Sequence, residues 1–238
     1  TRVPIRGLPK AFDGFRILQL SDIHHGPYTL PEDLRRMEEC VVKSEADLIV
    51  LTGDFILNSI QYMEPCAEML GRLRAPQGVF AVLGNHDMRE GGDRIQEILT
   101  RRGIRVLRDS HVILNKDAES LLLAGVSDLE EDEPDPGAAL QSDGREYPAI
   151  LLSHNPDIAE FMDGLRVDLI ISGHTHGGQF VFPWIGPIFM PNKYWKYREG
   201  LCKGPTGWVF ISRGIGTTLL PLRINCPPEI SVIELRQG

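Results

Sequence analysis

Six of the seven histidines in the chain come shortly after apolar, strand-like segments, in polar turns that contain glycine or asparagine. They are His24, His25, His86, His154, His174 and His176, whereas His111 lies elsewhere. In open α/β sheets, the loops at the carboxyl ends of the strands converge on a ligand site. Six imidazoles in such turns therefore indicate a shared site, although any one of them alone would be an ordinary turn residue.

Short motifs pair metal-binding side chains two residues apart. Asp22 and His24 are separated by one residue, and so are His174 and His176. In extended chain, residues i and i+2 point to the same side of the backbone. We therefore expect an extended conformation at both motifs, with two donors directed at one point.

Three more donors end other strand-like segments. Asp54 follows Gly53, whose conformational freedom lets the backbone turn tightly and bring the carboxylate inward. The seven expected metal ligands are two carboxylates, four imidazoles and one amide oxygen: Asp22, His24, Asp54, Asn85, His154, His174 and His176. Without a thiolate, this set suits Mn, Fe, Zn, Co or Ni better than a cysteine-rich structural zinc site.

Seven donors exceed the needs of one tetrahedral ion and fit two ions that share a carboxylate. Two divalent ions against two aspartates leave about two positive charges, so the centre would attract phosphate esters. Two such ions about 3.5–4 Å apart can activate a hydroxide and hold the attacking and leaving oxygens. The formal net charge of -8, from 25 Lys and Arg against 33 Asp and Glu, argues against a nucleic-acid polymer as partner.

Apolar segments alternate with helical patterns in the first half of the chain and predict a layered α/β fold. The strands that lead into the site are expected at 16–22, 46–54, 78–87, 149–154 and 167–176, with further strands at 120–126, 208–212 and 229–235. Their continuous Ile, Val and Leu centres are typical of strands buried on both faces. Helices are expected at 31–44, 66–73 and 95–99, with a short one from 155 to 164. Without repeats or a low-complexity linker, we expect one domain over residues 1–238.

Composition and the four cysteines exclude several other classes of protein. With 42% hydrophobic and 24% charged residues the chain is of ordinary globular composition. No C-x-x-C pair supports a zinc finger or a thioredoxin, and Cys202 with Cys226 could form a disulfide only in an oxidising compartment. No segment approaches the ~18 apolar residues of a membrane span. Because the chain begins at Thr1, we expect that an upstream segment was cut off or was never built.

One acidic segment, residues 128–135, contains six carboxylates, and Pro134 and Pro136 oppose regular structure there. Charge runs of this kind are usually solvated, so we expect a surface loop and not a metal site. Asp128, Asn58 and Arg89 fall near expected edges of the site, where they could contact a substrate, although each residue type is more often simply on the surface.

Five short motifs, taken in order, resemble those of the calcineurin-like metallophosphoesterase superfamily. They are Asp22-x-His24, Gly53-Asp54, Gly84-Asn85-His86-Asp87, the single His154, and Gly173-His174-Thr175-His176. The resemblance extends from about Phe15 to the C-terminus. It implies a four-layer α/β sandwich, with two mixed β-sheets packed face to face and helices outside.

The same resemblance implies roles for individual residues. Asp22, His24 and His176 would hold one metal, Asn85, His154 and His174 the other, and Asp54 would bridge both. His86 would contact the substrate phosphate and assist the leaving oxygen, and Asp87 would orient the ring of His86. The activity implied is hydrolysis of a phosphodiester or pyrophosphate by a metal-bridging hydroxide, with Mn or Fe as the first expectation and Zn, Ni or Co as alternatives.

A narrower likeness concerns the segments that follow. Residues 174–179 (HTHGGQ) and 220–230 (LPLRINCPPEI) look like the YaeI/YkuE-like bacterial branch of the superfamily. Members of this branch usually carry an N-terminal membrane anchor or export signal, and related enzymes hydrolyse UDP-2,3-diacylglucosamine. The likeness implies a bacterial, membrane-associated enzyme on an unspecified side of the membrane, with a lipid-linked substrate. The alternatives are a phosphodiesterase for nucleotides or cyclic nucleotides, and a non-catalytic scaffold of the same fold, which would be expected to lack some of the seven ligands.

The segment Phe180–Trp195 concentrates aromatic and aliphatic residues directly after the histidine pair. Its prolines prevent a continuous helix, so it cannot span a membrane. Two interpretations remain: a loop whose apolar side closes the core, or an exposed lip beside the metals that contacts acyl chains or a bilayer. Trp184, Tyr194 and Trp195, with Lys193 and Lys196, would suit the second, because aromatic and basic groups favour a membrane interface.

Overall fold

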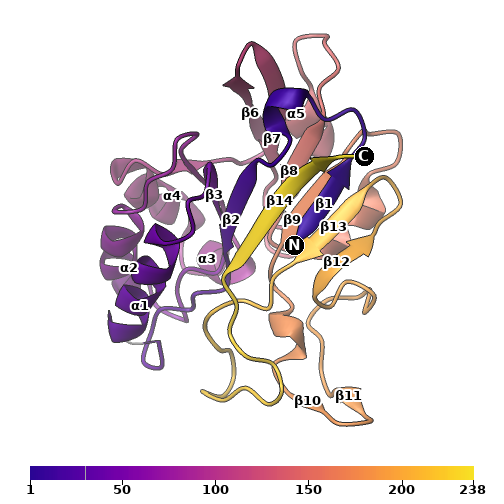
Figure 1. The fold of residues 1–238 in the computed structure, drawn as a ribbon. Helices are drawn as coiled ribbons and strands as arrows, with labels where there is room; N and C mark the ends of the chain where they lie inside the picture. The colour runs from indigo at the N-terminus through magenta and orange to yellow at the C-terminus, as the bar shows by residue number, and fades with distance from the viewer. Residues whose placement is uncertain (30) are drawn as a thin grey trace.

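Two six-stranded sheets face each other across an apolar core in the computed structural model, which describes residues 1–29 and 31–238 (Figure 1). In spatial order the first sheet contains β1 (Arg2–Ile5), β14 (Ser231–Gln237), β2 (Arg16–Leu20), β3 (Leu48–Thr52), β4 (Val79–Val82) and β5 (Arg105–Val106). Strands β2 to β5 are parallel, and β14 runs antiparallel to β2. This sheet is therefore mixed, with a parallel half that leads into the site.

The second sheet is also mixed. Its order is β12 (Gly200–Lys203), β13 (Trp208–Ile211), β9 (Leu169–Ser172), β8 (Ala149–Leu152), β7 (Glu119–Gly125) and β6 (Ser110–Lys116). The four central strands are parallel and the two edge strands antiparallel. A small separate hairpin of β10 (Val181–Phe182) and β11 (Gly186–Pro187) projects from one end of the molecule (Figure 1).

Helices cover the outer faces of both sheets. An apolar cluster joins the first sheet to α1 (Pro31–Val42), α2 (Met63–Leu70) and α4 (Gly92–Arg101). The second sheet packs against α5 (Pro136–Leu140) and the 3₁₀ helix η3 (Pro156–Phe161). The remaining short helices are η1 (Lys10–Phe12), η2 (Ile60–Tyr62), α3 (Asn85–Arg89) and η4 (His176–Gly178). The expected four-layer α/β sandwich is confirmed.

The strands that lead into the site are shorter than their apolar segments. Their central residues are buried, as the continuous Ile, Val and Leu centres predicted. The segment expected as a strand over 78–87 ends as a strand at Val82, and α3 begins at Asn85. Each strand thus ends a few residues before its polar motif, which leaves the motif in a loop.

Three expectations about the rest of the chain can be compared with the structure. In the described chain, all four cysteines are free thiols, so Cys202 and Cys226 form no disulfide here. Across residues 1–29 and 31–238, no helix has both the length and the apolar character needed to cross a bilayer. His111 lies apart from the other histidines, with its Nδ1 donating to the carbonyl of Ala139.

Candidate metal centre

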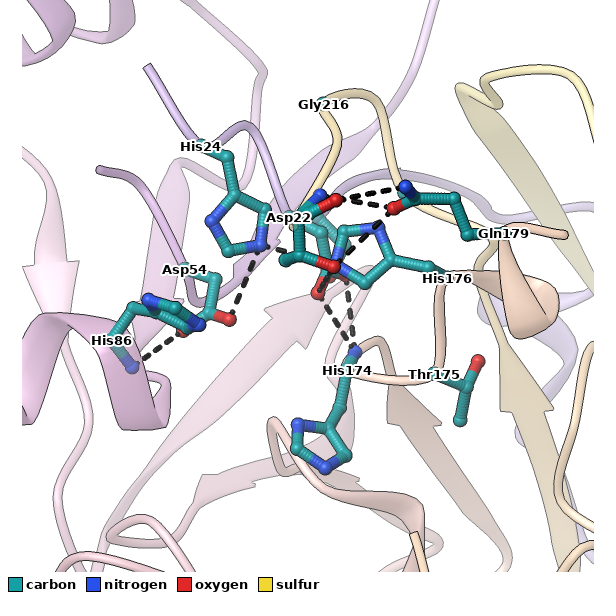
Figure 2. A network of polar contacts seen from close by, with 12 residues as sticks. Asp22, His24, Asp54, His86, His174, Thr175, His176, Gln179 and Gly216 are labelled. Atoms are coloured by element: carbon teal, nitrogen blue, oxygen red, sulfur yellow. Dashed lines mark hydrogen bonds and ion pairs between the residues drawn. The ribbon is translucent and has the colours of Figure 1, made fainter. Parts of the chain in front are cut away.

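The loops that follow β2, β3, β4, β8 and β9 bring all seven expected ligands to one edge of the two facing sheets. Each of these side chains is at least nine-tenths buried, and the most exposed, Asn85, keeps 6% of its surface accessible. Figure 2 shows Asp22, His24, Asp54 and His176 turned toward a common region, although they come from distant parts of the chain. The structure therefore brings together every residue that the sequence predicted as a ligand.

The conformation of the paired motifs differs from the expected one. We expected extended chain, but Asp22, His24, His174 and His176 have φ between 46° and 69°, in the left-handed region. That expectation was wrong: the side chains converge because the backbone turns sharply at each of them. Asp54 has the same kind of conformation, with φ 55°. Non-glycine residues rarely adopt it, at a cost of order 1–3 kcal/mol each, and such strain concentrates at functional sites.

Glycines allow the loops to approach one another closely. Gly53 has φ 87°, and a Cβ atom there would lie 2.5 Å from the backbone nitrogen of Gly84. A Cβ atom on Gly84 would lie 2.3 Å from Oδ1 of Asp54. Side chains at either position would separate the β3 and β4 loops and move Asp54 out of the site.

Asp22, His24 and His176 form the first group of candidate ligands. Nε2 of His24 lies 3.0 Å from Nε2 of His176, which is 3.4 Å from Oδ1 of Asp22. The carboxylate of Asp22 also accepts the backbone N–H of His174, which fixes its direction. Burial lowers the pKa of His24 to about 3, so this ring is neutral and can offer a lone pair to a metal ion.

His154, His174 and Asn85 form the second group. Nε2 of His154 lies 3.2 Å from Nδ1 of His174. The Nδ1–H of His154 donates to the carbonyl of Thr52 at 2.7 Å, which directs Nε2 at the site. Burial would lower the pKa of His154, but the charge of Asp54 outweighs it and raises this pKa well above its usual value, so a metal ion at Nε2 would displace a proton. The side-chain oxygen of Asn85 is buried and has no hydrogen-bond partner among the described residues. A buried polar atom without a partner is costly, and a metal ion would satisfy it.

Asp54 lies between the two groups. Its Oδ2 is 3.4 Å from Nε2 of His24 and 3.3 Å from Nε2 of His154, and its Oδ1 accepts the backbone N–H of His86. Burial would raise the pKa of Asp54, but the charge and hydrogen bond of His154 outweigh it and hold the pKa well below its usual value. This carboxylate therefore stays ionised and could contact both metal positions. The oxygen and imidazole donors fit the divalent ions expected from the sequence.

His86 and Asp87 differ in their relation to this cluster. The ring of His86 packs edge-on against His24, with 4.8 Å between centroids, and faces the cavity. Asp87 is fully buried, and its carboxylate accepts the backbone N–H groups of Asp54, Phe55 and Gly84. Within residues 1–29 and 31–238 it makes no hydrogen bond to the ring of His86. Asp87 thus fixes the loops that carry Asp54 and His86, and any effect on that ring would pass through the backbone.

The acidic segment contributes a residue that sequence analysis did not assign to the site. Oε1 of Glu130 lies 3.1 Å from Nε2 of His174, and Oε2 accepts a hydrogen bond from the amide of Asn85 at 3.2 Å. The neighbouring ring of His174 lowers the pKa of Glu130. The expectation of a solvated surface loop was wrong for this part of the segment. One signal in the sequence could have indicated this role: Glu130 follows β7 shortly after its end, and β7 pairs with β8, whose following loop carries His154.

A second unassigned residue, Arg223, lies behind His176. Its guanidinium is 3.2 Å from Nδ1 of His176 and also donates to the carbonyls of Arg213 and Gly216. Burial lowers the pKa of Arg223, and burial together with this guanidinium lowers the pKa of His176 well below its usual value. His25, in contrast, donates to the carbonyl of Thr29 and lies beside the site without joining it, as expected.

A cavity of about 620 Å³ opens over the candidate ligands. Polar groups of the site line its floor, among them Asp54, His86 and His176. Part of its wall is apolar, and includes Phe180, Phe189 and Leu219. Asn58 and Arg89 also line the cavity, whereas Asp128 is buried and accepts the N–H groups of Glu130 and Glu131. The cavity therefore offers a charged floor beside an apolar wall.

Comparison with solved structures shows the fold. The 5'-nucleotidase precursor from Thermus thermophilus superposes with a TM-score of 0.53 at 13% identity, covering 94% of this chain and 54% of that one. At this identity the likeness concerns the fold alone.

Comparison of sequences shows the family. The model of the calcineurin-like phosphoesterase domain matches residues 15–178. The "Uncharacterized metallophosphoesterase YkuE" of Bacillus subtilis is 36% identical over 233 residues, which cover 96% of this chain and 82% of that protein. The "Phosphodiesterase YaeI" of Escherichia coli is 32% identical over 228 residues, which cover 93% of this chain and 82% of that protein. The chain thus belongs to the calcineurin-like phosphoesterase family, in the branch of YkuE and YaeI, and is a metal-dependent phosphoester hydrolase.

Proposed function

We propose that this protein hydrolyses a phosphodiester or a pyrophosphate at a centre of two metal ions. Asp22, His24 and His176 would hold the first ion, Asn85, His154 and His174 the second, and Asp54 both. The observation that supports this most strongly is the convergence of seven buried ligand side chains from five strand ends, with the carboxylate of Asp54 between His24 and His154. When bound, two such ions activate water and offset the negative charge of the phosphate. We expect Mn or Fe, with Zn, Ni or Co as alternatives.

The chain's own residues supply the remaining chemistry. The ring of His86 faces the cavity beside the metal ligands, where it can hold a proton for the oxygen of the departing group. Asp87 keeps the loop of His86 in place through three backbone hydrogen bonds. The apolar wall of the cavity excludes water from one side of the substrate, which strengthens the electrostatic interactions there.

We propose further that the substrate is amphiphilic, such as a nucleotide joined to a lipid through a pyrophosphate. Phe180, Phe189 and Leu219 line the cavity together with His86, so a phosphate at the metals would have an apolar group beside it. The protein would then work at a bacterial membrane, with peripheral contact through residues of the segment Phe180–Trp195. The proposal of an amphiphilic substrate can fail while the proposal of phosphoester hydrolysis stands.

The test uses metal-stripped protein reloaded with one metal at a time. Elemental analysis should find about two ions per chain, and hydrolysis of bis(p-nitrophenyl) phosphate should depend on them. Substrate panels of cyclic nucleotides, linear nucleotides and UDP-2,3-diacylglucosamine then separate the substrate classes. Preference for the lipid-linked pyrophosphate would support the amphiphilic substrate, and preference for a soluble nucleotide would contradict it. Full metal loading without hydrolysis of any phosphoester would contradict the function itself.

A further inference from the structure

Two loops project together from the end of the molecule that carries the metal centre (Figure 1). The first comprises residues 180–191 and contains the β10–β11 hairpin, and the second comprises residues 217–222. We call these two loops the apolar tip. Neither contains a charged residue, although 24% of the whole chain is charged. The tip therefore differs in composition from the rest of the surface.

Large apolar side chains of the tip are open to solvent. The exposed fractions are 103% for Trp184, 78% for Ile185, 64% for Ile188, 58% for Phe189, 80% for Leu219, 57% for Leu220 and 52% for Leu222. Met190, at 5%, packs inward. The interpretation of this segment as a loop that closes the core therefore fails for most of its apolar residues. An exposed apolar patch of this kind marks a surface that meets another apolar phase.

The buried side chain of Gln179 joins the two loops. Its amide nitrogen donates to the carbonyls of Thr218, Leu220 and Leu222 at 2.8, 3.1 and 3.0 Å. Its amide oxygen accepts the backbone N–H of Thr218 at 2.9 Å. One side chain thus satisfies four backbone polar groups of the second loop from inside the tip.

Two more hydrogen bonds join the first loop to the chain that directly follows the second loop. The N–H of Val181 donates to the carbonyl of Ile224, and the amide of Asn225 donates to the carbonyl of Val181. Trp184 and Leu219 adopt left-handed conformations, with φ 63° and 56°, a costly arrangement that holds both side chains outward. These internal hydrogen bonds lower the cost of bringing this part of the backbone close to an apolar phase, where no water would satisfy it.

We propose that the apolar tip inserts into the surface of a lipid bilayer and positions the metal centre at the level of the headgroups. This inference rests on the proposed function and gives its substrate a location: a phosphoester displayed at a lipid surface. Phe189 and Leu219 belong both to the tip and to the cavity wall, so the cavity opens next to the inserted side chains. The amphipathic indole of Trp184 suits the interface between headgroups and chains.

The charge of the tip predicts which lipids it needs. The basic residues expected to contribute follow the tip and are engaged there: Nζ of Lys193 lies over the ring of Tyr194 at 5.2 Å from its centroid, and Nζ of Lys196 pairs with Glu160 at 2.7 Å. With no cation within the tip itself and a net charge of -8, anionic lipids gain little attraction. Binding should therefore occur on neutral phosphatidylcholine vesicles and change little between low and high salt.

The experiment measures binding to vesicles and insertion of Trp184. In the variant Trp195→Phe/Trp208→Phe, Trp184 is the remaining tryptophan, so its emission should shift to the blue and be quenched by brominated phosphatidylcholine. Ile185→Ser and Leu220→Ser lie outside the cavity and should each lower the affinity for vesicles roughly tenfold. Val42→Ser, at a residue 76% exposed on α1, is the matched control and should change nothing.

Three other results would each overturn the proposal. They are absence of a Trp184 shift with vesicles, equal effects of the tip and control variants, and self-association in solution that the tip variants abolish. Hydrolysis of bis(p-nitrophenyl) phosphate by metal-loaded protein serves as the independent measurement. If that activity is present without vesicle binding, the tip proposal fails and the proposed function stands. If vesicle binding occurs without any hydrolysis, the proposed function fails instead.

Discussion

The two proposed metal positions have similar candidate ligands but opposite charges behind them. Behind His174, the Glu130 carboxylate lies 3.1 Å from Nε2. Behind His176, the Arg223 guanidinium lies 3.2 Å from Nδ1. A carboxylate accepts the N–H of the ring and leaves the other nitrogen free for a metal, which is the usual arrangement around metal-binding histidines. The Glu130 carboxylate faces Nε2 of His174 at ion-pair distance, without a hydrogen bond between them in the described chain, so we expect its charge to favour a proton on Nε2 and to leave Nδ1 for the proposed second metal.

Arg223 has the opposite effect on the first position. A guanidinium can only donate, so Nδ1 of His176 must accept, and in a neutral ring the proton then lies on Nε2. That nitrogen faces His24 and Asp22, so a metal bound there must displace the proton. We expect the second position to bind its metal more tightly than the first. The comparison shows that the residues behind the ligands, and not only the ligands, distinguish the two positions.

Removal of the carboxylate of Asp54 should weaken metal binding at both proposed positions, which is the largest effect we expect. The variant Asp54→Asn removes a charge from both positions, so we expect its metal content to fall from about two ions per chain toward none. Elemental analysis after dialysis measures this directly. Asp117→Asn, in the turn between β6 and β7, removes one carboxylate away from the site and is the control. Full occupancy of both positions in Asp54→Asn would refute the bridging role.

A change at His86 should leave both metals and reduce turnover. Because its ring faces the cavity beside His24, we expect His86→Ala to lower kcat by ~10²–10⁴ for a poor leaving group such as an alkoxide. A nitrophenolate leaving group needs little protonation, so the reduction in kcat should be smaller for a nitrophenyl ester. Rates with the two classes of substrate, at measured metal content, test the assignment. Equal losses with both classes would make His86 a binding residue and not an acid.

The site residues could be predicted from sequence, whereas the way they converge could not. Polar motifs after continuous apolar segments picked out seven candidate ligands that the structure brings together, because buried parallel strands end at a common edge. The left-handed backbone at Asp22 and His174 was not predictable from local preference, since non-glycine residues avoid it. Distant loops pack closely around Asp22: a Cβ atom on Gly173 would lie 2.3 Å from its Oδ2, and one on Gly214 would lie 2.6 Å from its Cβ.

The residues behind the ligands were missed for a related reason. Glu130 lies in a segment whose composition is typical of solvated loops, and only the strand order brings it to His174. Arg223 is 47 residues from His176, and the contact depends on the fold of the C-terminal loop. Composition and spacing report which side chains are available. They do not report which of them lie behind a given ring.

A change at Glu130 should weaken only the second position. Glu130→Gln keeps the shape but loses the charge that faces His174 and Asn85, and outer contacts of this kind are typically worth ~10–100-fold in metal affinity. Metal-stripped protein is titrated with Mn or Zn. In the variant, the affinity of the tighter binding step should fall toward the affinity of the weaker step. Glu131→Gln, which loses a pair with Arg89 and touches neither ligand, is the matched control. Equal weakening of both steps would contradict a role confined to the second position.

A change at Arg223 should have the smallest effect on metal affinity, and it should raise this affinity where the change at Glu130 lowers it. In Arg223→Gln, the side-chain oxygen can accept the Nδ1–H of His176, so Nε2 becomes free and the first position should bind its metal more tightly, by less than the ~10-fold typical of outer contacts. The substitution also leaves buried carbonyls of Arg213 and Gly216 short of a donor, so the melting temperature should fall. Arg213→Gln, which loses ion pairs with Glu199 and Glu229, separates the two effects: it should lower stability without changing the first binding step. If Arg223→Gln remains folded and binds the first metal more weakly, then the guanidinium supports this position, and the proposed contrast between the two positions is wrong.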